Sequence, residues 1–261
     1  MPFIDIIKLK NSGQNKKDNK VMRRSKMGKK NKVAAFLLIA ILFLSNSSPV
    51  MAKEILPETN SEFIILVDPG HGGIDGGAVG RDATLEKNVN LMIGKKLKDA
   101  LVKEGYHVLM TREEDKGLYT DNGRIRKKKL EDLNNRQKMI KDSQCQIFLS
   151  IHLNMFPQQQ YHGAQVWYAA NEKSRKFGLM AQENLRKDLN NENKREAKAA
   201  KDSYIILRNP PDIAAIIVEC GFMSNAEEAA KLKNSDYQEK IAQSLLKTVK
   251  QYTEENRQSV N

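Results

Sequence analysis

Two histidines lie where short apolar runs of this sequence end. His71 sits among glycines shortly after the run 63–67, and His152 closes the run 147–151. Glu86 lies between them in sequence, at the start of a helical stretch. In an α/β domain, groups at the carboxyl ends of neighbouring strands converge on one crevice. Two imidazoles and one carboxylate can hold a zinc ion and leave its fourth position open for water, so these residues predict a catalytic zinc site.

A third apolar run, at 213–218, ends in Glu219. A carboxylate after an apolar strand is costly to bury unless it is paired or performs chemistry. Partial burial raises the pKa of a carboxyl group towards the range useful to a general base, whereas a nearby zinc ion opposes that shift. We expect Glu219 to act as the base, which makes the chain a predicted zinc hydrolase.

Glu86 has a competing explanation. Thr84 would cap a helix that begins at Leu85, and an acidic side chain in the first turn favours the helix dipole. Capping of this kind needs no metal.

The turn around His71 has its own expected partner. Glycines on both sides permit positive φ angles and close approach of the backbone to a metal or ligand. Asp68 or Asp75 would accept the free ring N–H of His71 and fix its tautomer. The sequence leaves the choice between the two carboxylates open.

Strand-like runs alternate with helical periodicities along the mature chain, and this alternation favours a mostly parallel sheet with helices on both faces. Two polar segments, 115–129 and 155–162, are expected to be surface loops, and the second leaves the predicted crevice. The fold class is therefore expected to be α/β, as a single domain. Strands are expected at 63–67, 106–111, 146–151, 164–169, 204–207 and 214–218, and helices at 85–104, 130–142, 172–191 and 226–255.

Residues 1–52 are expected to lie outside the fold. The run 33–44 is an uninterrupted stretch of 12 apolar residues, preceded by lysines and followed by small and polar residues. This pattern is typical of an export signal, with cleavage after Ala52 and a start at Met1 or Met27. The alternative, a membrane-spanning helix, needs about 20 apolar residues. The expected boundaries are a signal at 1–52, a linker at 53–61, a catalytic domain at 62–255 and a tail at 256–261.

The charge of the chain is concentrated in the predicted signal. Residues 1–52 hold 11 Lys and Arg against 2 Asp and Glu, a net +9 of the total +12, which leaves +3 for the mature part. That part has no basic stripe with interleaved aromatics, so we expect no nucleic-acid partner. Cys145 opens one strand-like run and Cys220 follows the end of another, which places the thiols roughly 20 Å apart, beyond disulfide reach.

Five motifs, in order, resemble the zinc-dependent N-acetylmuramoyl-L-alanine amidases of the family-3 type. The resemblance covers about residues 62–255. Departures such as Gly76 for a usual proline lie outside the predicted metal set. The motifs are Asp68-Pro-Gly-His-Gly-Gly-x-Asp75, Leu85-Glu-Lys87, Thr111-Arg-x-x-Asp115, Ser150-Ile-His-x-Asn154 and Val218-Glu-x-Gly-Phe-x-Ser-Asn225.

This resemblance implies a six-stranded, mostly parallel sheet, with His71, Glu86 and His152 as ligands of Zn²⁺ and Glu219 as the catalytic glutamate. The activity it implies is hydrolysis of the amide between N-acetylmuramic acid and L-alanine. Loop sequences resemble the sporulation and germination branch, whose members act in the spore cortex, where peptide removal precedes muramic-δ-lactam formation. An extracytoplasmic location follows, in the cell wall or the forespore intermembrane space.

Two other functions stay open: another zinc peptidase of the cell wall, and a wall-binding scaffold without activity. The expected partners are peptidoglycan as substrate and an exported protein activator. Contact with a membrane is expected only through an uncleaved signal.

Two residues are predicted to contact the substrate. Asn154 adds a polar group two residues after His152, and Arg208 would bind peptide carboxylates or glycan unless it simply faces solvent. The remaining histidines, His107 and His162, are assigned no metal role.

Overall fold

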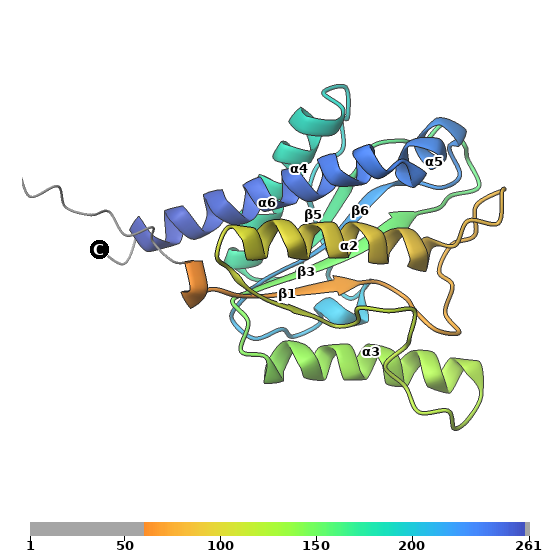
Figure 1. Cartoon of the computed structure of the whole chain (residues 1–261), viewed down its shortest axis with the longest axis horizontal. Helices are drawn as coiled ribbons and strands as arrows, with labels where there is room; N and C mark the ends of the chain where they lie inside the picture. The colour runs from red at the N-terminus through yellow and green to blue at the C-terminus, as the bar shows by residue number, and fades with distance from the viewer. Residues whose placement is uncertain (1–59, 259–261) are drawn as a thin grey trace, which may run out of the picture. The chain divides into compact units, whose positions relative to one another are not determined.

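A computed structural model describes residues 60–258 of the protein (Figure 1). The predicted export signal and all but the end of the predicted linker lie outside the described residues. Within the described part of the chain, no helix is long and apolar enough to cross a bilayer.

Six strands form one sheet in the order β2-β1-β3-β6-β4-β5. All neighbouring pairs are parallel except β4 with β6, which are antiparallel. The single-domain α/β fold with a six-stranded, mostly parallel sheet is therefore confirmed. The strands are β1 (Ile64–Pro69), β2 (His107–Met110), β3 (Ile147–Asn154), β4 (Gln165–Tyr168), β5 (Lys198–Ala199) and β6 (Ala214–Phe222).

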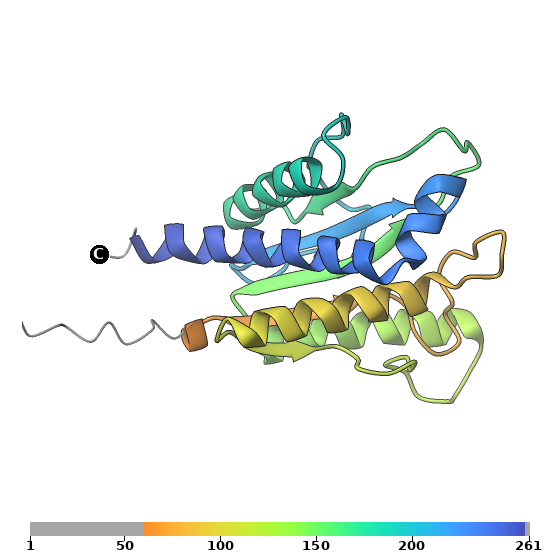
Figure 2. The ribbon, with the colours of Figure 1, turned by 45° about the horizontal axis from the view of Figure 1, so that its top comes forward.

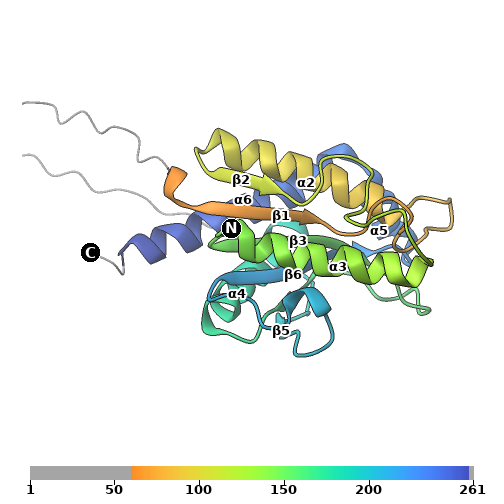
Figure 3. The ribbon, with the colours of Figure 1, turned by 90° about the horizontal axis from the view of Figure 1, so that it is seen from below.

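Helices cover both faces of the sheet. On one face lie α2 (Glu86–Lys103), α4 (Glu172–Leu189) and α6 (Ser235–Gln258), which are seen side by side in Figure 2. The other face carries α3 (Ile125–Asp142), seen in front of the sheet in Figure 3. The remaining elements are the 3-10 turns η1 (Asn60–Glu62) and η2 (Ile205–Leu207) and the short helix α5 (Ala226–Lys233).

The central strands are buried on both faces, as their continuous apolar runs require. Every residue of β6 is buried, and alternate side chains enter two separate core clusters. One cluster lies under α2, α4 and α6, and includes Ile216 and Val218. The other lies on the opposite face, and includes Ala215 and Ile217. Cys145 and Cys220 are both buried, and they form no disulfide with each other, as their predicted separation requires.

Three predictions about elements were wrong. The run 204–207 forms η2 instead of a strand, because Ile206 and Leu207 bury against the core on the α3 side of the sheet. The sixth strand is the two-residue β5. The long C-terminal helix is two helices, because Asn234 is extended and its side chain accepts the first N–H groups of α6. Helix α3 begins at Ile125, within the segment predicted to be a loop.

Candidate metal centre

The three predicted ligands meet at the carboxyl end of the central strands. His71 lies in the turn after β1, Glu86 is the first residue of α2, and His152 lies in β3. One nitrogen of each histidine and a carboxylate oxygen of Glu86 lie within 4.8 Å of one another. The two imidazole rings stand edge to face, with their centroids 4.9 Å apart. The three side chains form the candidate metal centre.

Glu86 joins the two histidines. Its Oε2 lies 3.3 Å from Nε2 of His71, and its Oε1 lies 3.1 Å from Nδ1 of His152. The carboxylate is buried and also accepts the backbone N–H groups of Ala78 and Leu153, at 2.8 and 2.9 Å. Together with the Asn90 amide, which donates to Oε1 at 3.3 Å, these five polar contacts fix the position of the carboxylate and favour its charged form.

The capping explanation for Glu86 does not describe this structure. Helix α2 begins at Glu86, with Leu85 at the N-cap position and no side-chain cap. The Glu86 carboxylate faces the two histidines and the backbone of two other segments, as the contacts above show. The side chain of Thr84 makes no capping bond to the helix.

Burial and hydrogen bonding work against each other in this cluster. Burial alone would raise the pKa of Glu86, but the hydrogen bonds and charges of His152 and His71 hold it far below its usual range. Burial alone would lower the pKa of His71, but hydrogen bonds to Asp75 and Glu86 raise it to about 9. A proton on His71 therefore offsets the charge of the buried Glu86 carboxylate. A bound cation would take that role and release protons.

The turn that carries His71 is held in an unusual conformation. His71 itself has a φ of 62°, and Gly72 and Gly73 follow with φ values of 136° and 58°. A side chain with a positive φ persists only where its surroundings determine it, and such residues cluster at functional sites. Two buried arginines supply the surroundings here.

Both arginines donate to the carbonyl groups of this turn. Arg112 donates to the carbonyls of Pro69 and Gly70, at 2.9 and 3.0 Å. Arg136, on α3, donates to the carbonyl of His71 at 2.8 Å. Neither arginine was predicted from the sequence, although Arg112 lies inside one of the quoted motifs. Asp68 could have indicated a buried arginine, because a carboxylate inside an apolar strand requires a buried cation.

The two carboxylates considered for His71 have different positions. Asp75 Oδ2 lies 2.9 Å from Nδ1 of His71, while its Oδ1 pairs with Lys129 at 2.7 Å. Asp68 is fully buried. It pairs with Arg136 and accepts hydrogen bonds from the hydroxyl groups of Ser150 and Thr111. Asp75 is therefore the carboxylate beside the His71 ring, and Asp68 anchors Arg136.

Glu219 lies opposite His152 in the β3–β6 register. Its Oε1 accepts the hydroxyl of Tyr204 at 3.3 Å, and its buried Oε2 has no hydrogen-bond partner among the described residues. Burial raises the pKa of Glu219, and Glu86 adds to this against the opposing charge of His152. Tyr204 was missed from the sequence, since the run 204–207 was read as a strand.

Two glycines leave room for the cluster. A side chain at Gly70 would overlap the His152 ring, and a Cβ at Gly77 would lie 2.6 Å from Oε2 of Glu86. Gly77 also has a positive φ of 69°. The glycine-rich turn is therefore needed for close approach of the backbone as well as for its curvature.

The predicted substrate contacts are less closely tied to this centre. Arg208 is exposed and donates to the backbone carbonyl of Asp202. Asn154 ends β3, and its carbonyl accepts the N–H of Met223 at 2.8 Å. Among the described hydrogen bonds, neither side chain contacts the three clustered residues, so both substrate contacts stay predictions.

The donor set suits a zinc ion. Two neutral imidazoles and one carboxylate are a common protein ligand set for catalytic zinc. The buried Oε2 of Glu219 lacks a partner beside them, as expected of a group that meets water or substrate. Fold and site together define an α/β protein with the features of a metal-dependent hydrolase.

Comparisons with known proteins identify the family. A family model described as N-acetylmuramoyl-L-alanine amidase matches residues 65–251. The germination-specific N-acetylmuramoyl-L-alanine amidase of Bacillus subtilis is 39% identical over 237 residues, which cover 87% of this chain and 96% of that protein. The chain belongs to the N-acetylmuramoyl-L-alanine amidase family and is an amidase of that class, as its motifs predicted.

Solved structures agree with this assignment. The CwlD amidase from Clostridioides difficile, solved in complex with the GerS lipoprotein, has a TM-score of 0.71 and 39% identity, covering 74% of this chain and 98% of that one. An N-acetylmuramoyl-L-alanine amidase from Clostridium difficile 630 has a TM-score of 0.64 and 26% identity, covering 75% of this chain and 98% of that one.

Proposed function

We propose that His71, Glu86 and His152 hold a zinc ion, and that Glu219 is the catalytic base for cleavage of the amide between N-acetylmuramic acid and L-alanine. The observation that carries this proposal is the buried Oε2 of Glu219, which has no partner within residues 60–258 and lies on β6, the strand next to that of His152. A buried carboxylate oxygen without a partner is unfavourable for stability, so a role in chemistry is the economical explanation.

The chemistry supplied by zinc, when bound, is polarisation of the scissile carbonyl and a lower pKa for a water, from about 15.7 towards about 7. Glu219 takes the proton of the attacking water at Oε2, because Tyr204 already donates to Oε1. Its raised pKa lets Glu219 keep that proton and then pass it to the departing alanine nitrogen. Asp75 accepts the Nδ1 proton of His71 and leaves Nε2 free to bind the metal.

Mass spectrometry of digested peptidoglycan tests the reaction. Incubation with the zinc-loaded protein should release intact stem peptides that begin at L-alanine. Release of D-alanine alone would indicate a carboxypeptidase, and the absence of any product would indicate a wall-binding scaffold.

We further propose an extracytoplasmic role in the spore cortex. The support is the similarity to a germination-specific amidase over most of both chains, together with the predicted export signal. Deletion of the gene should abolish muramic-δ-lactam in the spore cortex, and expression of a Glu219→Gln variant should not restore it. Normal lactam content in the deletion strain would rule out this role.

We also propose that an exported protein activates the enzyme. A related amidase has been solved with a lipoprotein bound. Here the His71 turn depends on a surface loop, because Asp115 accepts the N–H of Gly73 and Tyr119 accepts the N–H of Ile74, at 2.9 and 2.8 Å. A partner that orders this loop would raise metal occupancy.

The activator proposal is tested by measuring zinc content and turnover of the mature protein with and without a lipoprotein related to that partner. Both quantities should be low in the isolated protein and should rise on addition. A fully zinc-loaded isolated protein that turns over at a typical rate, on the order of 1–10³ per second, would contradict the activator and leave the amidase assignment intact.

A further inference from the structure

The proposed base, Glu219, is held by far fewer contacts than the proposed metal ligand Glu86. Two imidazoles, one amide and two backbone N–H groups surround the carboxylate of Glu86. Within residues 60–258, the carboxylate of Glu219 accepts one hydrogen bond, from the hydroxyl of Tyr204 to Oε1 at 3.3 Å. Misplacement of a reacting group by about 1 Å can cost on the order of 10²-fold in rate. The orientation of Glu219 therefore depends on what holds Tyr204.

The ring of Tyr204 packs against the ring of Trp167, with centroids 5.5 Å apart and planes inclined by 48°. Trp167 lies opposite Ile217 in the β4–β6 register. Side chains two residues apart on a strand share a face of the sheet, so Trp167 and Glu219 project from the same face. This is the face covered by α3, because Trp167 and Ile217 contribute to the core cluster on that side. The Trp167 ring therefore supports Tyr204 on the face where Glu219 lies.

The backbone around Tyr204 forms a short closed loop. Lys201 and Asn209, at the two ends of the loop, both have a φ of 47°, a left-handed conformation that side chains seldom adopt. Between them, Arg208 donates to the carbonyl of Asp202 at 3.1 Å, and η2 buries two of its three side chains in the core. Conformations of this kind persist where the surroundings determine them, and they are common at functional sites. The loop therefore holds Tyr204 in a defined position.

Helix α3 connects this loop to the turn that carries His71. Gln137 donates to the carbonyls of Ile205 and Arg208, at 2.6 and 3.4 Å. The preceding residue of the helix, Arg136, donates to the carbonyl of His71 at 2.8 Å. Two consecutive side chains of α3 therefore hold the segment that contacts the proposed base and the turn that carries a proposed metal ligand.

We propose that Tyr204 is a positioning residue for Glu219: its hydroxyl fixes Oε1 and thereby leaves Oε2 as the oxygen that takes the proton. This proposal rests on Glu219 being the base. Trp167 and Gln137 act on the reaction through Tyr204, because they hold its ring and its backbone. Among the described hydrogen bonds, Tyr204 has none to the three clustered residues, so loss of its hydroxyl should affect turnover and leave zinc binding unchanged.

The kinetic test uses the zinc-loaded protein and a soluble peptidoglycan fragment with intact stem peptides. Tyr204→Phe keeps the ring and its packing on Trp167 but removes the hydroxyl. The value of kcat should fall by about ten-fold, as expected for loss of one hydrogen bond to a charged group, while KM and zinc content stay unchanged. Gln137→Met keeps a side chain of similar length without the donor, and should lower kcat by about three-fold.

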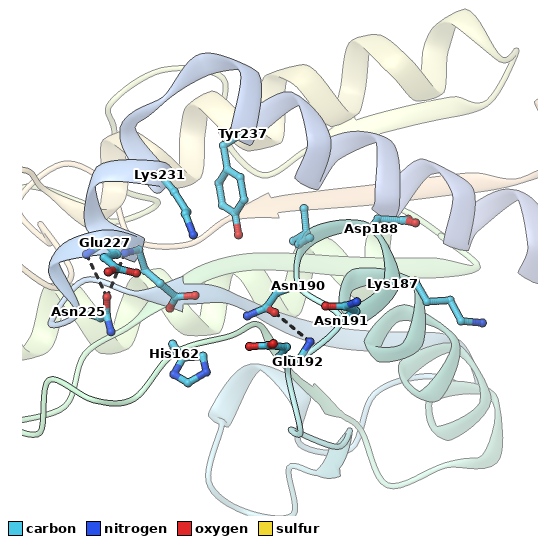
Figure 4. Close-up of a pocket in the computed structure, with 12 residues that line it drawn as sticks. His162, Lys187, Asp188, Asn190, Asn191, Glu192, Asn225, Glu227, Lys231 and Tyr237 are labelled. Atoms are coloured by element: carbon cyan, nitrogen blue, oxygen red, sulfur yellow. Dashed lines mark hydrogen bonds between the residues drawn. The ribbon is translucent and has the colours of Figure 1, made fainter.

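Two other tyrosines serve as matched controls. Tyr106 shares a buried hydroxyl hydrogen bond with Thr253 at 2.8 Å, and it precedes β2, at the edge of the sheet opposite the site. Tyr237 points into a separate cavity of about 560 Å³, between the segment after α4 and α5 with the start of α6 (Figure 4). Tyr106→Phe and Tyr237→Phe should both keep the wild-type kcat. Thermal unfolding of every variant separates an effect on turnover from an effect on folding.

Combination with Glu219→Gln distinguishes this proposal from the proposed function. If Tyr204 acts through Glu219, adding Tyr204→Phe to Glu219→Gln should slow turnover no further. A wild-type kcat in Tyr204→Phe, loss of zinc from that variant, or an additive loss in the double variant would overturn the positioning role. A slow Glu219→Gln beside a normal Tyr204→Phe removes this proposal alone. Full activity of Glu219→Gln would refute the base assignment, and the positioning role with it.

Discussion

The site contains two buried carboxylates whose surroundings shift their pKa values in opposite directions. Glu86 receives two imidazoles and two backbone N–H groups, and its pKa falls. Glu219 receives one hydroxyl, and its pKa rises. Neighbouring carboxyl groups whose environments separate their pKa values in this way typically have different roles in catalysis.

The separation of roles predicts opposite results for two isosteric substitutions. Glu219→Gln keeps the shape but cannot take a proton, so zinc should stay bound while turnover falls by about 10² to 10⁴. Glu86→Gln should weaken zinc binding itself. Metal analysis and turnover on the same preparations check both. Loss of zinc from Glu219→Gln alone would exchange the two assignments.

Loss of either histidine should empty the site. His71→Ala and His152→Ala each leave two protein ligands, which are too few for stable zinc binding. Stoichiometric zinc in either purified, folded variant would remove that histidine from the ligand set. Gly70→Ala should lower zinc content too, because the new methyl group would overlap the His152 ring. Gly76→Ala is the control for the effect of adding a methyl group, because a Cβ there would meet only the Leu85 side chain, at an ordinary contact distance of 3.5 Å.

At the scale of elements, the buried pair of Asp68 and Arg136 joins β1 to α3, next to the turn that carries His71. Burial alone would raise the pKa of Asp68, but Arg136 and two hydroxyl groups hold it below the usual 3.8. The unfolded chain therefore takes up this proton first as the pH falls. The stabilisation is complete above a pH of about 4 and is lost below it, as the pH falls through the folded-state pKa.

This pair predicts a large effect on stability. Asp68→Asn leaves Arg136 with an uncompensated part of its charge and should lower the free energy of unfolding by about 3–5 kcal/mol at neutral pH. The deficit should shrink in acid, as Asp68 becomes protonated in the wild type. Urea unfolding at several pH values measures both effects. Asp121→Asn, which breaks an exposed pair with Lys128, should cost no more than about 1 kcal/mol.

The elements that could be predicted are those whose pattern of apolar residues reflects burial in the fold. The strands β1, β3 and β6 are continuous apolar runs, and the ends of these runs identified His71, His152 and Glu219. The two-residue β5 has too little pattern to be recognised. The break at Asn234 was missed because apolar periodicity continues across it, although Asn is a common capping residue.

The residues missed at the site share a physical reason. The partners of these residues are distant in sequence, so the residues that flank them in the chain do not indicate their roles. This applies to Arg112, Arg136 and Tyr204. Basic residues near the start of α3 indicated a solvated loop, and the tertiary pairing with Asp68 is what buries Arg136. The clustering of His71, Glu86 and His152 could therefore be predicted from the sequence, whereas the groups that hold these side chains in place required the fold.

At the scale of the whole molecule, α6 completes the face of the sheet that faces away from α3. It packs against both α2 and α4, and contributes Ile241, Leu245, Val249 and Tyr252 to the core as buried side chains. Burial of each such side chain stabilises a protein by about 1.5–3 kcal/mol. The four together are comparable to the entire stability of a typical domain, about 5–15 kcal/mol.

A chain of residues 60–258 should therefore fold, whereas a chain that ends at Asn234 should not. The longer chain contains both core clusters and all four proposed site residues, so it should unfold in one cooperative thermal transition. The shorter chain keeps every strand and every site residue but exposes the apolar faces of α2 and α4. Calorimetry and near-ultraviolet circular dichroism distinguish the two outcomes. A cooperative transition in the shorter chain would show that α6 is dispensable for the core, and that the site is supported by the sheet, α2 and α3 alone.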